Sequence, residues 1–294
     1  MSYKLSALIT DTLKRLNVIN VRVASGGSTA SAVVATIIGD FDDESWTGGY
    51  VFVIKTTDNL APVGEWAAVT AYTSSTGTFT CATSSFTAAI GSGDTIGFVN
   101  KFDYPIPDVI DQVNLALQDL GDIPLVDIST LTTASQQSEY SYAVDWKRNQ
   151  PVRIDIQQKK NDTNDYQWQE LFAWEYIPSA PGTAGLIVFR ETLPAGYLLR
   201  VWYEDRHPEV TIYSSAIAES IRPSLAQLAV LDKLLSWKNA GISGQDDFLL
   251  QFRNEIMEKL ANERQLLKPY KPKRKNKIVT YNQVPSWKDR IQGP

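Results

Sequence analysis

Apolar side chains recur at three- and four-residue intervals in four separate segments, a spacing that is typical of amphipathic helices. The four segments span residues 3–16, 106–120, 215–238 and 244–267. Pro107 suits the first turn of the second segment, because no helical hydrogen bond needs its missing N–H. Gly241 separates the third segment from the fourth. We therefore predict four helices, of which the first two lie far along the chain from the others.

Between these segments the chain changes to short apolar runs that alternate with polar residues, which is typical of strands. In residues 17–103, Gly-Gly, Asp-Asn and Ser-Thr-Gly turns separate the runs, and a small antiparallel barrel or sandwich is expected. The strands predicted there are Val21–Val23, Ala32–Ile38, Tyr50–Ile54, Ala67–Tyr72, Thr78–Ala82 and Thr95–Val99. Residues 122–213 form a second, aromatic-rich β region. Its expected strands are Val152–Ile156, Leu171–Ile177, Gly185–Arg190 and Leu198–Tyr203.

These elements predict an α+β fold in which a four-helix bundle is assembled from distant segments. A short helix is only marginally stable alone in water, so the first helix should pack on the others. The bundle would combine residues 1–16, 104–121 and 214–267. The two antiparallel β regions, of barrel or sandwich type, would be insertions at residues 17–103 and 122–213. In residues 268–294, Pro269, Pro272 and Pro285 lie among basic residues and predict an extended C-terminal tail.

Composition narrows the class of protein. Of 294 residues 43% are hydrophobic and 21% charged, as in ordinary globular proteins. The single cysteine, Cys81, excludes an intrachain disulfide and the paired spacing of common zinc sites. No apolar run is long enough for a membrane span, and the first 20 residues lack the pattern of a signal peptide. We therefore expect a protein that is made and assembled in a reducing cytoplasm, without a membrane partner.

Charge is distributed unevenly along the chain. From Lys268 to the end there are eight basic residues and one acidic residue, a net charge of +7. The first 267 residues hold 20 basic and 32 acidic residues, a net charge of −12. A strap that mixes basic with apolar residues suits a groove on an acidic protein, where it would order on binding. Contact with nucleic-acid phosphates is the rival use, and a solvated tail is the simplest alternative. The predicted docking residues are Lys271, Lys273, Arg274, Lys275, Lys277, Ile278, Val279, Tyr281 and Trp287.

Residues that could carry chemistry are few. His207 is the single histidine, and no GxSxG motif accompanies it, so we interpret it as a loop residue. Asp40, Asp42, Asp43 and Glu44 could hold a calcium ion, but they lack the EF-hand spacing, and a solvated acidic loop is the simpler interpretation. We expect no enzyme activity, no cofactor and no metal.

The four helices followed by a basic extension resemble the head–tail connector, or adaptor, proteins of tailed bacteriophages. Three stretches of the first β region, GEWAAVTAY, TGTFT and AAIGSGDT (residues 64–72, 76–80 and 88–95), look like a β module of phage virion proteins. The stretch DQVNLAL (residues 111–117) looks like the helix that follows this module. Both β insertions depart from the smallest adaptors.

This resemblance implies a structural virion protein without chemistry. A homo-oligomeric ring of about twelve copies would join the portal of the head to a tail or neck protein. The ring would continue the DNA channel without binding DNA sequence-specifically, and its C-terminal tail would dock on the portal. The protein would be found in the phage neck after assembly in the host cytoplasm.

Three alternatives remain open at this stage. The protein could be another neck or tail component of the virion. It could be a glycan-binding β module that uses Trp168, Trp174 and Trp202. A hydrolase that depends on His207 is the third.

Overall fold

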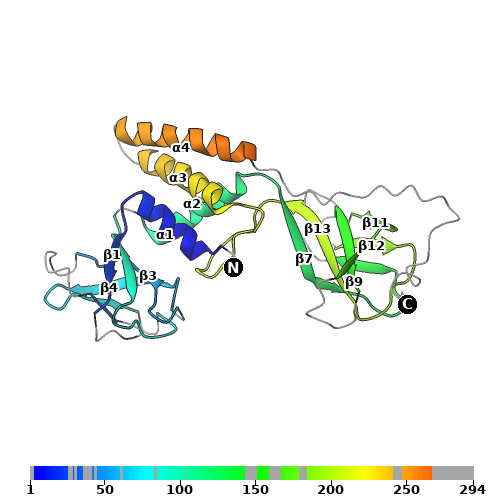
Figure 1. The fold of residues 1–294 in the computed structure, drawn as a ribbon, viewed down its shortest axis with the longest axis horizontal. Coiled ribbons are helices and arrows are strands. Elements are labelled where there is room, and N and C mark those ends of the chain that lie inside the picture. Colours follow the sequence, from blue (N-terminus) through cyan, green and yellow to red (C-terminus); the bar gives the residue numbers. More distant parts are fainter. Residues whose placement is uncertain are drawn as a thin grey trace. The chain divides into compact units, whose positions relative to one another are not determined.

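The structure is a computed structural model of the chain. It describes residues 3–25, 29, 32–35, 42, 45–59, 62–82, 85–102, 104–142, 151–158, 167–178, 184–240 and 247–266. These residues contain four helices and 13 strands, the strands being arranged in three antiparallel sheets (Figure 1). They divide into two compact units. The described residues up to 121 and from 206 onward form unit 1, and those from 122 to 205 form unit 2.

Unit 1 contains a six-stranded antiparallel sheet. Its strands, in spatial order, are β1 (Asn20–Val23), β6 (Thr95–Val99), β3 (Tyr50–Lys55), β4 (Trp66–Thr73), β5 (Thr78–Cys81) and β2 (Ala32–Val34). The strands predicted in this region are confirmed over the described residues. Burial alternates along β5 and along β4, where one register shift falls between Val69 and Ala71, and this alternation is why the sequence pattern located both strands.

The two edges of this sheet approach each other. Ser25, two residues after the end of β1, donates its backbone N–H to the carbonyl oxygen of Val34 in β2 at 2.8 Å. The rings of Phe79 and Phe98 stack inside the curled sheet with their centroids 4.0 Å apart. Cys81 is buried in the same core, and burial raises the pKa of its thiol to about 11. This thiol is therefore a packing residue rather than a reactive group.

Four helices complete unit 1. They are α1 (Leu5–Arg15), α2 (Ile106–Gln118), α3 (Pro223–Ala240) and α4 (Asp247–Leu266). Helix α3 is central, because α1, α2 and α4 each pack against it (Figure 1). It buries apolar side chains on several sides, as a helix surrounded by others must. These side chains are Leu225, Ala226, Leu228, Ala229, Val230, Leu231, Leu234 and Leu235.

Unit 2 is a two-sheet sandwich. One sheet has the order β10 (Trp168–Leu171), β9 (Arg153–Gln157), β13 (Leu198–Asp205) and β7 (Ile123–Thr132). The other has the order β11 (Trp174–Ile177), β12 (Gly185–Phe189) and β8 (Glu139–Tyr142). Buried side chains of both sheets form one core, which includes Ile154, Ile156, Leu199, Val201, Tyr142, Ile187 and Phe189. Unit 2 begins and ends on paired strands, since Ile123 of β7 lies opposite Asp205 of β13.

The prediction of a four-helix bundle with two β insertions is wrong as a description of the fold. Over the described residues the protein is mostly β, with three antiparallel sheets and four helices. Among the described residues, α1, α2 and α4 pack on α3 but make no comparable contact with one another, so no closed bundle forms. The six-stranded sheet also lies in the same compact unit as the helices. Periodic apolar residues revealed which faces are buried, but they could not reveal which element covers each face.

Several element boundaries also differ from the predictions. Helix α3 begins at Pro223, not at residue 215, because Pro223 suits a first helical position and Ile217 and Ile221 are buried in the segment before it. The strand predicted at Leu171–Ile177 is two strands, β10 and β11, which belong to different sheets. Strands β7 and β8 were not among the predicted strands, and β7 contains Pro124. As an edge strand of its sheet, β7 tolerates a residue without an N–H.

Candidate interaction site on helix α2

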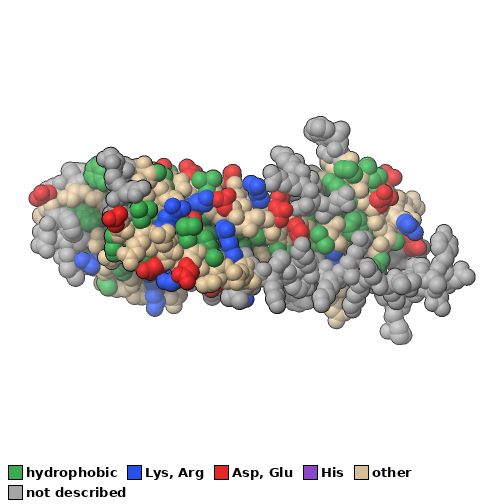
Figure 2. All heavy atoms as spheres, turned by 90° about the horizontal axis from the view of Figure 1, so that it is seen from above, with side chains coloured by type: hydrophobic (Ala, Val, Ile, Leu, Met, Phe, Trp, Pro, Cys, Tyr) green, Lys and Arg blue, Asp and Glu red, His purple; other side chains and the backbone are tan. Residues whose placement is uncertain are grey.

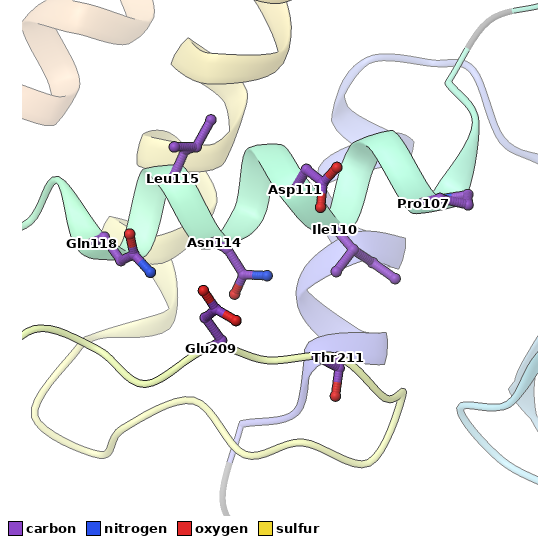
Figure 3. Close-up of a pocket in the computed structure, with 8 residues that line it drawn as sticks. All are labelled: Pro107, Ile110, Asp111, Asn114, Leu115, Gln118, Glu209 and Thr211. Atoms are coloured by element: carbon purple, nitrogen blue, oxygen red, sulfur yellow. The ribbon is translucent and has the colours of Figure 1, made fainter. Parts of the chain in front are cut away.

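The predicted docking residues of the tail, from Lys271 to Trp287, lie outside the described residues. The structure instead describes a surface on unit 1 that complements the chemistry of the tail. This surface is a groove between α2 and the chain segment that carries Glu209 and Thr211, and we call it the α2 groove (Figure 3). Its volume is about 510 Å³. The residues that line it are Pro107, Ile110, Asp111, Asn114, Leu115, Gln118, Glu209 and Thr211.

The amide of Asn114 fixes one wall of the groove. Its Nδ2 donates to the carbonyl oxygen of Val210 at 3.0 Å, and the backbone N–H of Val210 donates to Oδ1 at 2.8 Å. One residue can offer both backbone groups to a single amide only when it is extended. Val210 is buried, whereas its neighbours Glu209 and Thr211 are exposed on the groove side. The segment therefore runs beside α2 like a short strand.

Helix α2 contributes the apolar floor of the groove, which consists of Pro107, Ile110 and Leu115. Val109, Val113 and Leu117 turn toward the interior and are fully buried, as the three- and four-residue spacing requires. Leu115 lies off this face and keeps 49% of its surface exposed. Ile110 is only half-buried and points toward the segment of Glu209 (Figure 3).

The rim of the groove is acidic. Asp111 on α2 and Glu209 on the facing segment are both exposed, and none of the described lining residues is basic. Asp108, one turn earlier on α2, is also exposed but does not line the groove. A groove with an apolar floor and two carboxylates at its rim suits a basic, extended chain. Sequence reasoning missed this site, because its two walls come from segments almost a hundred residues apart.

His207 is held as a structural residue close to the same segment. The backbone N–H of Ala218 donates to Nε2 at 3.0 Å, so Nε2 carries no proton. Nδ1 lies 2.6 Å from the carbonyl oxygen of Pro208 and donates to it. The ring is 2% exposed, and this burial lowers its pKa below the ordinary value, so the imidazole is neutral. Both ring nitrogens are used by the backbone, which leaves neither to act as a catalytic base.

The three tryptophans of the glycan-binding alternative do not form one platform. Trp168 and Trp202 flank the guanidinium of Arg200, whose carbon lies 4.6 and 5.2 Å from the two ring centroids. Arg200 in turn pairs with buried Asp155, to which Trp202 also donates. Trp174 belongs to the other sheet and packs against the core of the sandwich. The stacking surface between the two tryptophans is therefore already filled by an arginine.

The acidic loop of residues 40–44, which we interpreted as solvated rather than as a calcium site, lies mostly outside the described residues. Asp42 is described and exposed, and its carbonyl oxygen accepts hydrogen bonds from Ser45. Asp40, Asp43 and Glu44 are not described. Within the described ranges, no group of three or more His, Cys, Asp or Glu side chains could hold a metal ion.

Charged side chains of both signs are interspersed with apolar ones on the face seen in Figure 2. None of the helices described is both long enough and apolar enough to cross a membrane.

No protein-family model matches this chain, and no curated protein matches it at a significant level.

Proposed function

We propose that this chain is a structural subunit of a tailed-bacteriophage virion, which forms a ring between the portal and the tail. The ring would continue the DNA channel, and the C-terminal segment 268–294 would dock on the portal. The proposal rests on the resemblance of the helices and tail to connector proteins, and on surfaces of unit 1 that suit contacts with neighbouring subunits.

The observation that carries the proposal is the outer side of α4. This helix has 20 residues, yet among its described side chains only Ile256 and Leu260 are fully buried. Met257 keeps 47% of its surface exposed, and half-buried Leu250 lies two turns earlier on the same face. A helix that packs on one partner and still exposes apolar side chains on its outer side is typical of a subunit interface.

Charge supports the same role. The acidic body, with a net charge of −12 over the first 267 residues, would repel DNA phosphates and let DNA slide through a channel without sticking. The tail, with a net charge of +7, would bind an acidic portal surface.

The test is the mass of the purified full-length protein alone and mixed with portal rings. We expect a ring-sized complex that co-sediments with portals. Deletion of residues 268–294 should abolish portal binding. Met257→Ala leaves the tail intact and should weaken only the contacts between subunits of the ring. A protein that stays monomeric in both conditions contradicts the ring, and undiminished portal binding after the deletion contradicts the docking role.

A further inference from the structure

The α2 groove and the basic part of the tail have complementary chemistry. Residues 271–277 read KPKRKNK and contain five basic side chains. The groove presents the carboxylates of Asp111 and Glu209 beside the apolar side chains of Pro107, Ile110 and Leu115. We propose that the α2 groove of one copy binds residues 271–277 of a neighbouring copy. This inference rests on the proposed function, since it takes the ring as its setting.

Length agrees with this assignment. The groove follows α2 from Pro107 to Gln118, and this stretch of helix measures about 18 Å at about 1.5 Å per residue. Seven residues of extended chain span about 23 Å. Residues 271–277 therefore cover the groove. This assignment moves the basic residues 271–277 from the portal to the neighbouring copy, and it leaves residues 278–294, with Ile278, Val279, Tyr281 and Trp287, to dock on the portal.

The kind of side chain agrees as well. Lysine and arginine stems are apolar up to their charged ends, so they can lie on Ile110 and Leu115 while the charges reach Asp111 and Glu209. Pro272 favours an extended backbone, which a narrow groove accepts and a helix does not.

Electrostatics favours a neighbouring copy as the source of the segment. Adjacent acidic bodies repel each other in a ring, because each carries a net charge of −12. A basic segment that crosses from one body to the next places positive charge where this repulsion is largest. The same segment on its own body would leave the boundary between copies less well neutralised.

Photo-crosslinking of the full-length protein tests the assignment. Leu115 is exposed, so the photo-reactive amino acid p-benzoylphenylalanine can replace it without disturbing the core. Equal amounts of protein labelled with ¹⁴N and with ¹⁵N are mixed under conditions that dissociate and re-form the assembly. After irradiation, mass spectrometry identifies the crosslinked peptides, and the mass of the assembly is measured on the same sample.

We expect crosslinks from position 115 to residues 268–294 that join ¹⁴N to ¹⁵N peptides. The double substitution Asp111→Lys with Glu209→Lys should lower their yield roughly tenfold, because two attractive pairs become repulsive. Asp108→Lys reverses a single charge on α2 outside the groove and should leave the yield within about twofold, and Asp111→Lys alone is the single-charge variant to compare with it.

Two outcomes would overturn the assignment. Crosslinks confined to peptides of one isotope place the tail on its own body, and the absence of crosslinks to residues 268–294 leaves the groove without this occupant. If either occurs while the ring mass is unchanged, the groove assignment fails and the ring proposal stands. If the measured mass of the sample is that of a monomer, both the groove assignment and the ring proposal are contradicted.

Discussion

The side-chain amide of Asn114 pairs with both backbone groups of Val210, which lies 96 residues further along the chain. These two bonds join α2 to the segment that leads from unit 2 back to the helices of unit 1. They also hold the facing wall of the α2 groove in place. Two neutral bonds of this kind contribute about 1–3 kcal/mol when their loss leaves buried backbone groups without partners.

Asn114→Ala should lower the free energy of unfolding of unit 1 by about 1–3 kcal/mol. The substitution leaves the N–H and carbonyl of buried Val210 without their partner. Urea unfolding followed by tryptophan fluorescence measures the effect. Gln118→Ala, one turn later on the same groove, is the matched control and should change stability by less than about 0.5 kcal/mol. Equal effects of the two substitutions would contradict a special role for the Asn114 amide.

Asp155→Asn should destabilise unit 2 strongly. The carboxylate is fully buried and accepts hydrogen bonds from Arg153, Arg200 and Trp202. Removing this charge leaves two arginines facing a neutral amide. We expect a loss of about 3 kcal/mol in the free energy of unfolding. This value is at the lower end for a broken buried ion pair, because both arginines keep about a fifth of their side-chain surface exposed. The exposed pair of Asp119 with Lys233 is the control, and Asp119→Asn should cost less than about 1 kcal/mol. Thermal unfolding of both variants decides between these expectations.

Stability should fall on acidification because of His207. Burial lowers the pKa of this histidine in the folded protein below the value of 6.5 that it has when unfolded. The unfolded chain therefore binds a proton first. The contribution of the neutral ring is complete above pH 6.5 and is lost as the pH falls from 6.5 through the folded pKa.

The measurement compares the free energy of unfolding of the wild type and of His207→Gln between pH 7.5 and pH 5. The variant should be less stable at pH 7.5 by about 1–3 kcal/mol, since the two hydrogen bonds of the ring are lost. The difference between the two proteins should shrink as the pH falls. If the difference in the free energy of unfolding between the two proteins stays constant over this range, protonation of the His207 imidazole is not linked to unfolding.

Gly49→Ala should destabilise the six-stranded sheet. A Cβ at this position would lie 2.5 Å from the carbonyl oxygen of Val99 and 3.0 Å from that of Trp46. Both are backbone atoms that cannot rotate away, so we expect a loss of about 1–3 kcal/mol in chemical unfolding. At Gly91 the nearest atom to an added Cβ is 3.5 Å away on the side chain of Asp94, so Gly91→Ala should be nearly neutral. Similar losses in both variants would mean that close packing at Gly49 is not the cause.

The sequence by itself determined the local elements of this protein. The strands of residues 17–103 and the helices α1, α2 and α4 follow from apolar periodicity, because a half-buried element must repeat its apolar residues at its own geometric period. The opposite charges of the body and the tail are likewise visible in the sequence alone.

Only the tertiary structure decided how these elements meet. In the folded protein α3 is the central helix, and Pro124 lies on an edge strand, where its missing N–H is tolerated. The guanidinium of Arg200 lies between Trp168 and Trp202. It also brought Asn114 to Val210 and so formed the α2 groove. The physical reason is that periodicity reports whether a face is buried, whereas the residue that covers it comes from a distant part of the chain and is selected by shape, hydrogen bonds and charge in the folded state.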